Sequence, residues 1–215
     1  NIGTSITTTS VIANASLPAY FAIGVGTVTT YYSYQSGDWN SSDTWTIDPS
    51  GSLWIAAAVP GPADNVVILN GRTVTINQNG KNCLSLEIKL GGTLDLQATN
   101  THNFGTVTGQ GSLKLSSGTF PGGDYTGFVA VEGGTVEYYN LNNTGISSTQ
   151  LTYNNLIISN YTAAANTVFL NNATNPINYN LNGNFDLNNN ASGSLYFYFG
   201  DSTPSDNHVY HIIRG

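Results

Sequence analysis

Charged residues are unusually few in this 215-residue chain. Only 8% of its residues are charged, about a third of the usual share. Five Lys and Arg residues face twelve Asp and Glu residues, which gives a formal net charge of −7. Such a surface cannot neutralise a row of phosphates, so we expect neither nucleic-acid binding nor attraction to anionic membranes.

Cysteine, methionine and long apolar runs are also scarce. The single cysteine, Cys83, excludes an internal disulfide and a thiolate metal site, and we expect it to be a small buried apolar residue. No segment approaches the roughly 20 apolar residues of a membrane span, so we expect no membrane insertion. The absence of methionine predicts a chain that follows a removed signal peptide or is part of a longer protein.

Thr, Tyr, Val, Gly and Asn are abundant instead, which is an all-β composition. From Val66 onward apolar residues alternate with polar ones, as in "CLSLEIKLGGTLDL", where Leu84, Leu86, Ile88 and Leu90 share one parity, and so do Leu94 and Leu96. Alternation of this kind predicts strands with one buried face.

Similar phrases recur along the chain. "TLDL" at 93, "SLKL" at 112 and "TVEY" at 135 are spaced by 19 and 23 residues. Short strands and glycine turns with a period near 20 predict a solenoid, specifically a parallel β-helix. The pairs Asn70-Gly71 and Gly91-Gly92 also suit hairpins, so a β-sandwich is the alternative.

Composition divides the chain into three parts. Residues 1–35 are uncharged and strand-prone, which suits a cap or a donor strand. Residues 36–65 hold all three tryptophans and several prolines and form a predicted capping unit. Residues 66–215 are the predicted coils, which stop at "HVYHIIRG" in what looks like an unblocked strand over 208–213.

Several of these phrases resemble a known family, the secreted surface β-helix repeat proteins of Bacteroidetes, which are often adhesin-like and exported by the type IX secretion system. The resemblance covers about residues 36–190, and the matching residues are Trp39, Trp45, Val59, Pro60, Asp64, Val66, Ile68, Tyr153, Asn154, Asn155, Leu156 and Ile158. It implies a right-handed parallel β-helix at a cell surface, without catalytic residues.

Aromatic residues are the candidate ligand contacts. Trp39, Trp45 and Trp54 offer a sugar-stacking platform or, alternatively, a plug for the open end of the solenoid. Tyr196 and Tyr198 in "LYFYF" lie on a strand with aromatics on both faces, which predicts a covering partner or a further coil.

A calcium site is the one metal site the sequence suggests. Asp38, Asn40, Asp43 and Asp48 lie close together in "DWNSSDTWTID", and hard oxygen ligands on a loop suit Ca²⁺. The same residue types form ordinary Asx turns, so both interpretations stay open. No other cofactor is expected.

We expect no enzymatic activity. Asp95 and Asp186 have the outward parity that a polysaccharide-active groove needs, but no basic cluster accompanies them in the sequence. "DST" at 201–203 resembles a Bacteroidetes O-glycosylation motif, which would place a sugar on Ser202.

The sequence therefore predicts a non-enzymatic, extracellular, structural or adhesive protein that contacts surface glycans, further coils or neighbouring subunits. Two alternatives stay open: a self-assembling fibre subunit joined through its terminal strands, and a polysaccharide-binding or polysaccharide-active β-helix.

Overall fold

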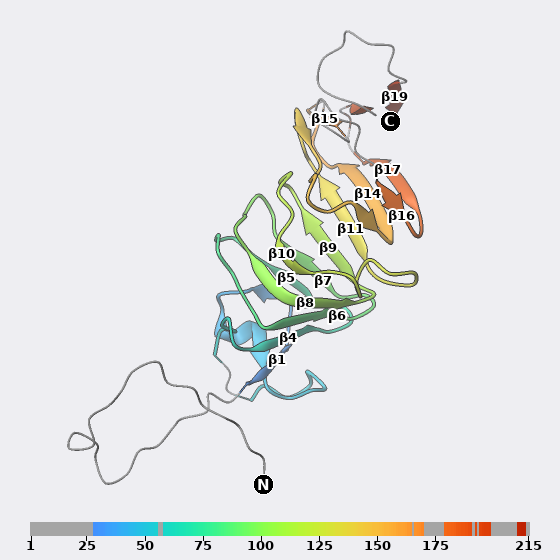
Figure 1. The fold of residues 1–215 in the computed structure, drawn as a ribbon. Coiled ribbons are helices and arrows are strands. Elements are labelled where there is room, and N and C mark those ends of the chain that lie inside the picture. Colours follow the sequence, from blue (N-terminus) through green and yellow to red (C-terminus); the bar gives the residue numbers. More distant parts are fainter. Residues whose placement is uncertain are drawn as a thin grey trace, which may run out of the picture.

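The computed structural model describes residues 28–55, 58–164, 166–169, 179–190, 192, 194–198 and 210–213, with the side chains of 196, 198 and 210–213 outside that description (Figure 1). In these ranges the regular secondary structure is strand, apart from one 3-10 turn, η2 (Ser42–Thr44), and turns or irregular segments connect the strands. The all-β prediction is confirmed. The strands are β1 (Thr30–Ser33), β2 (Gly37–Asp38), β3 (Trp45–Thr46), β4 (Asn65–Ile68), β5 (Thr73–Thr75), β6 (Ser85–Ile88), β7 (Thr93–Asp95), β8 (Asn103–Gly109), β9 (Ser112–Leu115), β10 (Gly122–Asp124), β11 (Thr135–Tyr139), β12 (Thr144–Gly145), β13 (Thr152–Tyr153), β14 (Asn155–Asn160), β15 (Asn166–Phe169), β16 (Asn180–Leu181), β17 (Phe185–Asn189), β18 (Leu195–Tyr198) and β19 (Tyr210–Ile213).

Two large sheets organise the fold. The first has the order β10-β8-β6-β4-β1-β3, and the second has the order β17-β14-β11-β9-β7-β5-β2. From β4 to β11 consecutive strands belong alternately to the first and the second sheet, and one passage through both sheets is here called a circuit. Each strand pairs in parallel with the strand of its own sheet in the preceding circuit. The strands rise in this way from β1 at one end of the molecule to β17 near the other (Figure 1).

The repeated phrases of the sequence lie in register, one above another, in the second sheet. Thr93 pairs with Ser112, and Ser112 pairs with Thr135. The unequal intervals between these residues are absorbed in the connecting segments, because the register of the strands is unchanged. The repeat predicted from the sequence is therefore confirmed as a structural repeat.

The glycine turns join strands of different sheets. Asn70-Gly71 lies between β4 and β5, which do not pair with each other, so it is a corner and not a hairpin turn. Gly71 has φ +71°, and its N–H donates to the carbonyl of Gly91, itself at φ +78°, in the corner of the next circuit. Glycine takes such angles without steric cost. Among the described strands, the antiparallel pairs are β1 with β3 and β18 with β19, so the hairpins of a β-sandwich are not what these turns form.

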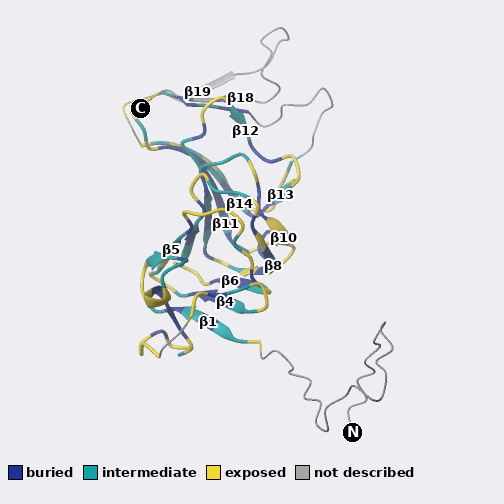
Figure 2. Ribbon diagram, turned by 90° about the vertical axis from the view of Figure 1, so that its left-hand side faces the viewer, coloured by how far each residue is buried: buried dark blue, intermediate teal, exposed yellow. Residues whose placement is uncertain are grey.

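Buried apolar side chains from both sheets form the core and stack in columns from strand to strand. Figure 2 shows the buried residues, in dark blue, along the ribbon. One such column runs through five consecutive strands of the second sheet, and each of its members is at most 1% exposed: Val74, Leu94, Leu113, Val136 and Leu156. Burying a side chain of this size contributes about 1.5–3 kcal/mol. The stability of each circuit therefore depends on its packing against the neighbouring circuits.

Two leucines depart from the predicted alternation. Leu86 and Ile88 are fully buried, as the parity indicates, but Leu84 is 48% and Leu90 64% exposed. The reason is that β6 spans only Ser85–Ile88, so that Leu84 and Leu90 lie at corners where strand parity no longer applies. Cys83 is buried and unpaired, as predicted.

The predicted boundaries are less distinct in the structure. β1, in the predicted N-terminal unit, pairs with β4, and the two belong to one sheet. At the other end, β19 pairs antiparallel with β18, so residues 210–213 of the predicted unblocked strand have a partner within the chain. Residues 1–27 lie outside the described residues, and the donor-strand prediction stays a prediction.

Candidate functional site

Trp39 and Trp45 lie inside the core. Both rings are fully buried, 5.1 Å apart in an edge-to-face arrangement, and Trp39 also contacts Phe104 with ring centres 5.9 Å apart. The indole N–H of Trp45 donates to the carbonyl of Trp39 at 2.8 Å. Buried rings have no free face for a sugar, so the structure places these two in the core and not in a stacking platform. Their position beside β3, the last strand of the first sheet, agrees with the capping alternative.

Trp54 differs from the other two tryptophans. Its side chain is 49% exposed, and its neighbours Leu53 and Ile55 are 66% and 43% exposed. Of the three predicted aromatic contacts in this block, Trp54 alone keeps a ring that a ligand can reach.

The predicted calcium ligands lie in three separate turns. Asp38 accepts the N–H of Asn40 at 2.6 Å, which is an Asx turn, and the Asn40 amide donates to Asn77. Asp48 accepts the hydroxyl and N–H of Ser50 and the N–H groups of Ser52 and Leu53. These bonds, first the Ser50 hydroxyl and then the Leu53 N–H, lower the pKa of Asp48 to about 2. Asp43 lies in the η2 turn.

Asx-turn chemistry thus accounts for Asp38 and Asp48 without an ion. In the described ranges, no three His, Cys, Asp or Glu side chains are grouped closely enough to hold a metal ion. Amide ligands such as Asn40 are not among these four residue types. The calcium site therefore stays a prediction, which a calcium-binding measurement would test.

Three further predicted site residues cannot be placed. Tyr196 and Tyr198 belong to β18, but their side chains lie outside the described residues, and so does the whole of Ser202.

The second sheet carries on its outer surface a cluster that the sequence analysis missed. Asp95, Lys114 and Glu137 are directly paired in register across β7, β9 and β11. They are the third residues of "TLDL", "SLKL" and "TVEY", so aligning the repeats letter by letter would have found the column. Asp186 lies further along the same column and is exposed, with Ile157 between it and Glu137.

Two tyrosines complete this group of five residues, here called the sheet-surface cluster. Lys114 Nζ lies 3.1 Å from Glu137 Oε2, and 5.2 Å and 5.1 Å from the ring centres of Tyr139 and Tyr161. The Tyr161 hydroxyl donates to Glu137 at 2.5 Å, and the Tyr139 hydroxyl donates to Asp95 at 2.9 Å. The ammonium is therefore held by a carboxylate and by two aromatic faces.

These contacts shift the pKa values of the lysine and the two tyrosines. Burial alone would lower the pKa of Lys114, but the hydrogen bond and charge of Glu137 outweigh it and the net pKa is raised. Burial, together with the bond to Asp95, raises the pKa of Tyr139, and burial with the bond to Glu137 raises that of Tyr161. At neutral pH the lysine is thus charged and both phenols are protonated, so none of the three is poised to act as a general base.

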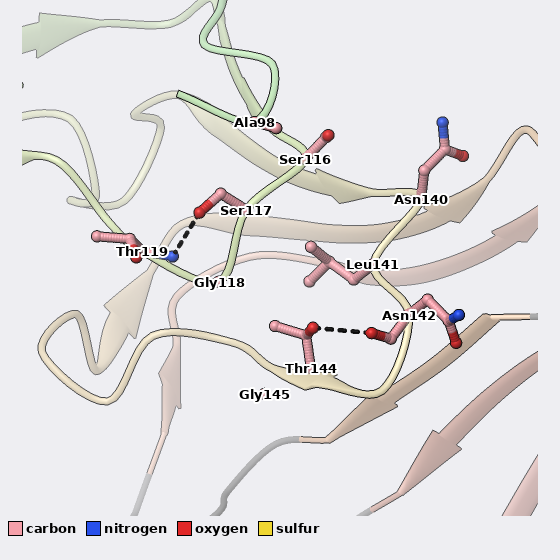
Figure 3. Close-up of a pocket in the computed structure, with 10 residues that line it drawn as sticks. All are labelled: Ala98, Ser116, Ser117, Gly118, Thr119, Asn140, Leu141, Asn142, Thr144 and Gly145. Carbon is pink, nitrogen blue, oxygen red and sulfur yellow. Dashed lines mark hydrogen bonds between the residues drawn. The ribbon is translucent and has the colours of Figure 1, made fainter. Parts of the chain in front are cut away.

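A shallow hollow of about 580 Å³ lies beside the cluster (Figure 3). Two chain segments face each other across it, one from Ser116 to Thr119 and one from Asn140 to Gly145. Their side chains are hydroxyls, amides and one leucine, with no charged group. A Cβ on Gly118 would meet the carbonyl of Gly145 at 2.4 Å, so the close approach of the two segments requires glycine.

Replacing Glu137 by glutamine is expected to destabilise the fold by about 1–2 kcal/mol, because Lys114 would keep its charge and lose its partner in a part-buried position. The matched control is Glu87→Gln, since Glu87 pairs with Lys89 at an exposed position, and we expect a change below about 0.5 kcal/mol there. Urea unfolding monitored by circular dichroism measures both. Equal losses in the two variants would show that the cluster adds no stability.

A buried histidine lies at a corner of the stack. The ring of His102 is 4% exposed and stacks on Phe104 at 5.6 Å. The Lys81 N–H donates to Nδ1 at 3.0 Å, so Nε2 carries the proton and donates it to the Thr99 hydroxyl at 3.0 Å. Burial is the main cause that lowers the pKa of this ring; the hydrogen bond from the Lys81 backbone offsets part of it, and the charge of Lys81 adds a smaller lowering. His102 is therefore neutral in the folded protein at pH 7.

This histidine makes stability depend on pH. Because its pKa is lower in the folded than in the unfolded chain, its contribution is complete above about pH 6.5 and is lost as pH falls below that value. We expect the melting temperature to fall between pH 7 and pH 5, and His102→Gln to flatten this slope. Differential scanning calorimetry over that range tests it, and an unchanged slope in the variant would contradict the assignment.

Comparisons with known proteins give no family for this chain: no family model, no curated protein and no solved structure matches it. In the part of the chain that the structure describes, no helix has the length and apolarity to cross a membrane.

Proposed function

We propose that this chain is part of a right-handed parallel β-helix that acts as a stiff, non-enzymatic structural or adhesive element outside the cell. The observation that carries the proposal is the alternation of consecutive strands between two parallel sheets in constant register. A chain that winds in this way grows in length and not in width, because each circuit contacts only its neighbours.

The surface chemistry supports a structural role over catalysis. The sheet-surface cluster has one lysine and two tyrosines that are protonated at neutral pH, and its two carboxylates already accept hydrogen bonds within the cluster. A polysaccharide hydrolase needs an acid and a base that are free to exchange protons with the substrate. The low charge, the abundance of Asn, Gly and Thr, and the resemblance to Bacteroidetes surface repeats support the extracellular location.

The shape is tested by small-angle X-ray scattering and negative-stain microscopy of the full chain. We expect single elongated particles, whereas a compact particle would contradict the β-helix. Regular filaments would favour the alternative of a self-assembling fibre subunit. The location is tested by labelling intact cells of the source organism with an antibody against the chain, and labelling that requires permeabilised cells would contradict a surface role.

A further inference from the structure

The side chain of Tyr161 is 46% exposed above the outer surface of the second sheet. Beneath it, the hydroxyl is fixed on Glu137 and the ring lies 5.1 Å from the Lys114 ammonium. Tyr139 lies beside it, with ring centres 6.1 Å apart at 64°. The exposed ring is therefore held in one orientation before any ligand arrives, which lowers the entropy lost on binding.

Hydrogen bonds connect both tyrosines to residues that line the hollow of Figure 3. The backbone N–H of Tyr161 donates to the side-chain oxygen of Asn140, which lines the hollow, at 2.7 Å. Ser116 also lines the hollow, and its hydroxyl hydrogen-bonds to Tyr139, which offsets part of the rise in the pKa of that phenol caused by burial and by Asp95. The two tyrosines are thus tied by hydrogen bonds to both segments that line the hollow.

The chemistry of this surface selects its ligand. Hydroxyls and amides in the hollow both donate and accept hydrogen bonds, as sugar hydroxyls do, and an aromatic face suits the C–H side of a pyranose. The charges nearby are one lysine and two carboxylates, and the lysine is already paired. The whole chain has a net charge of −7, which disfavours an acidic polymer.

We propose that Tyr161, Tyr139 and the hollow between Ser116–Thr119 and Asn140–Gly145 form a binding site for a neutral polysaccharide. The polymer stacks one sugar on Tyr161 and places the next in the hollow. The inference deepens the proposed adhesive function and rests on it for the biological source of the glycan.

Native affinity electrophoresis of the full chain tests the site. The gels contain hydroxyethylcellulose, galactomannan or laminarin as neutral probes, and alginate or polygalacturonate as acidic probes. We expect at least one neutral probe to retard the protein and the acidic probes to leave its mobility unchanged. Tyr161→Ala is expected to weaken retardation about tenfold, the effect of one lost stacking contact. Tyr161→Phe keeps the ring and is expected to keep most of the binding.

Two controls separate binding from folding. Tyr34→Ala removes a half-buried tyrosine that follows β1 and does not line the hollow, and it should leave retardation unchanged. Asn142→Ala, whose side chain lines the hollow, should weaken binding while the circular dichroism spectrum stays that of the parent. Retardation by the acidic probes alone, retardation by none of the five, or a Tyr161→Ala variant that binds like the parent would each overturn the inference. A failure of surface labelling on cells would count against the proposed location and leave this binding result unaffected.

Discussion

Alanine at Gly109 is expected to lower the free energy of unfolding by about 3 kcal/mol or more. Gly109 ends β8 with φ +106° and pairs in register with Ile88 of β6. A Cβ there would meet the carbonyl oxygen of Ile88 at 2.0 Å and its backbone nitrogen at 2.9 Å. Unfavourable backbone angles cost about 1–3 kcal/mol, and overpacking against rigid backbone costs a similar amount. Urea unfolding of the full chain measures the loss.

Gly71→Ala is the matched control for this prediction. Gly71 also has a positive φ, +71°, but a Cβ there would meet nothing within 4 Å. We expect it to cost only about 1 kcal/mol, the price of the backbone angle alone. If the two substitutions were equally harmful, the close approach of consecutive circuits at Gly109 would have no energetic role.

Truncation of Trp39 to alanine is expected to cost about 3–5 kcal/mol. Its ring is fully buried between Trp45 and Phe104, so its removal leaves a large cavity at the end of the core and exposes the first circuits. We expect early loss of the near-ultraviolet circular dichroism of the tryptophans and increased proteolysis within residues 28–55.

The corresponding control is Trp54→Ala. Since Trp54 is 49% exposed, its removal should cost about 1 kcal/mol or less. Thermal melts of the two variants, recorded beside the parent chain, give the comparison. A Trp39 variant as stable as the Trp54 variant would mean that the buried pair does not close the core.

The repeat shows how much of the fold could be predicted from the sequence. Alternation and the positions 93, 112 and 135 predicted short strands stacked in register, and the structure pairs those residues directly. The same alternation was wrong for Leu84 and Leu90, because parity holds only inside a strand and both residues lie at corners. Periodicity thus predicted where the strands lie, but it did not predict the residues at which each strand begins and ends.

The candidate site was less predictable. A linear reading treated the tryptophan block as one unit, whereas the structure buries Trp39 and Trp45 and exposes Trp54. Burial depends on which side chains meet in the fold, and Trp39 is buried where its ring contacts both Trp45 and Phe104. The sequence also separates Lys114 from Glu137, which lie in different circuits, so their ion pair exists only once β9 and β11 are in register.

By itself, the sequence determined the all-β class, the period of the repeat and the positions of the glycine turns, because each depends on local steric preference and on alternation along a single strand. Only the tertiary structure decided which residues of successive circuits meet. The cluster around Lys114, the exposed ring of Tyr161 and the hollow beside it arise from contacts between residues about 20 or more positions apart, such as Tyr161 with Glu137 and Tyr139 with Asp95. Stacking in register creates those contacts, and no single segment of the chain contains them.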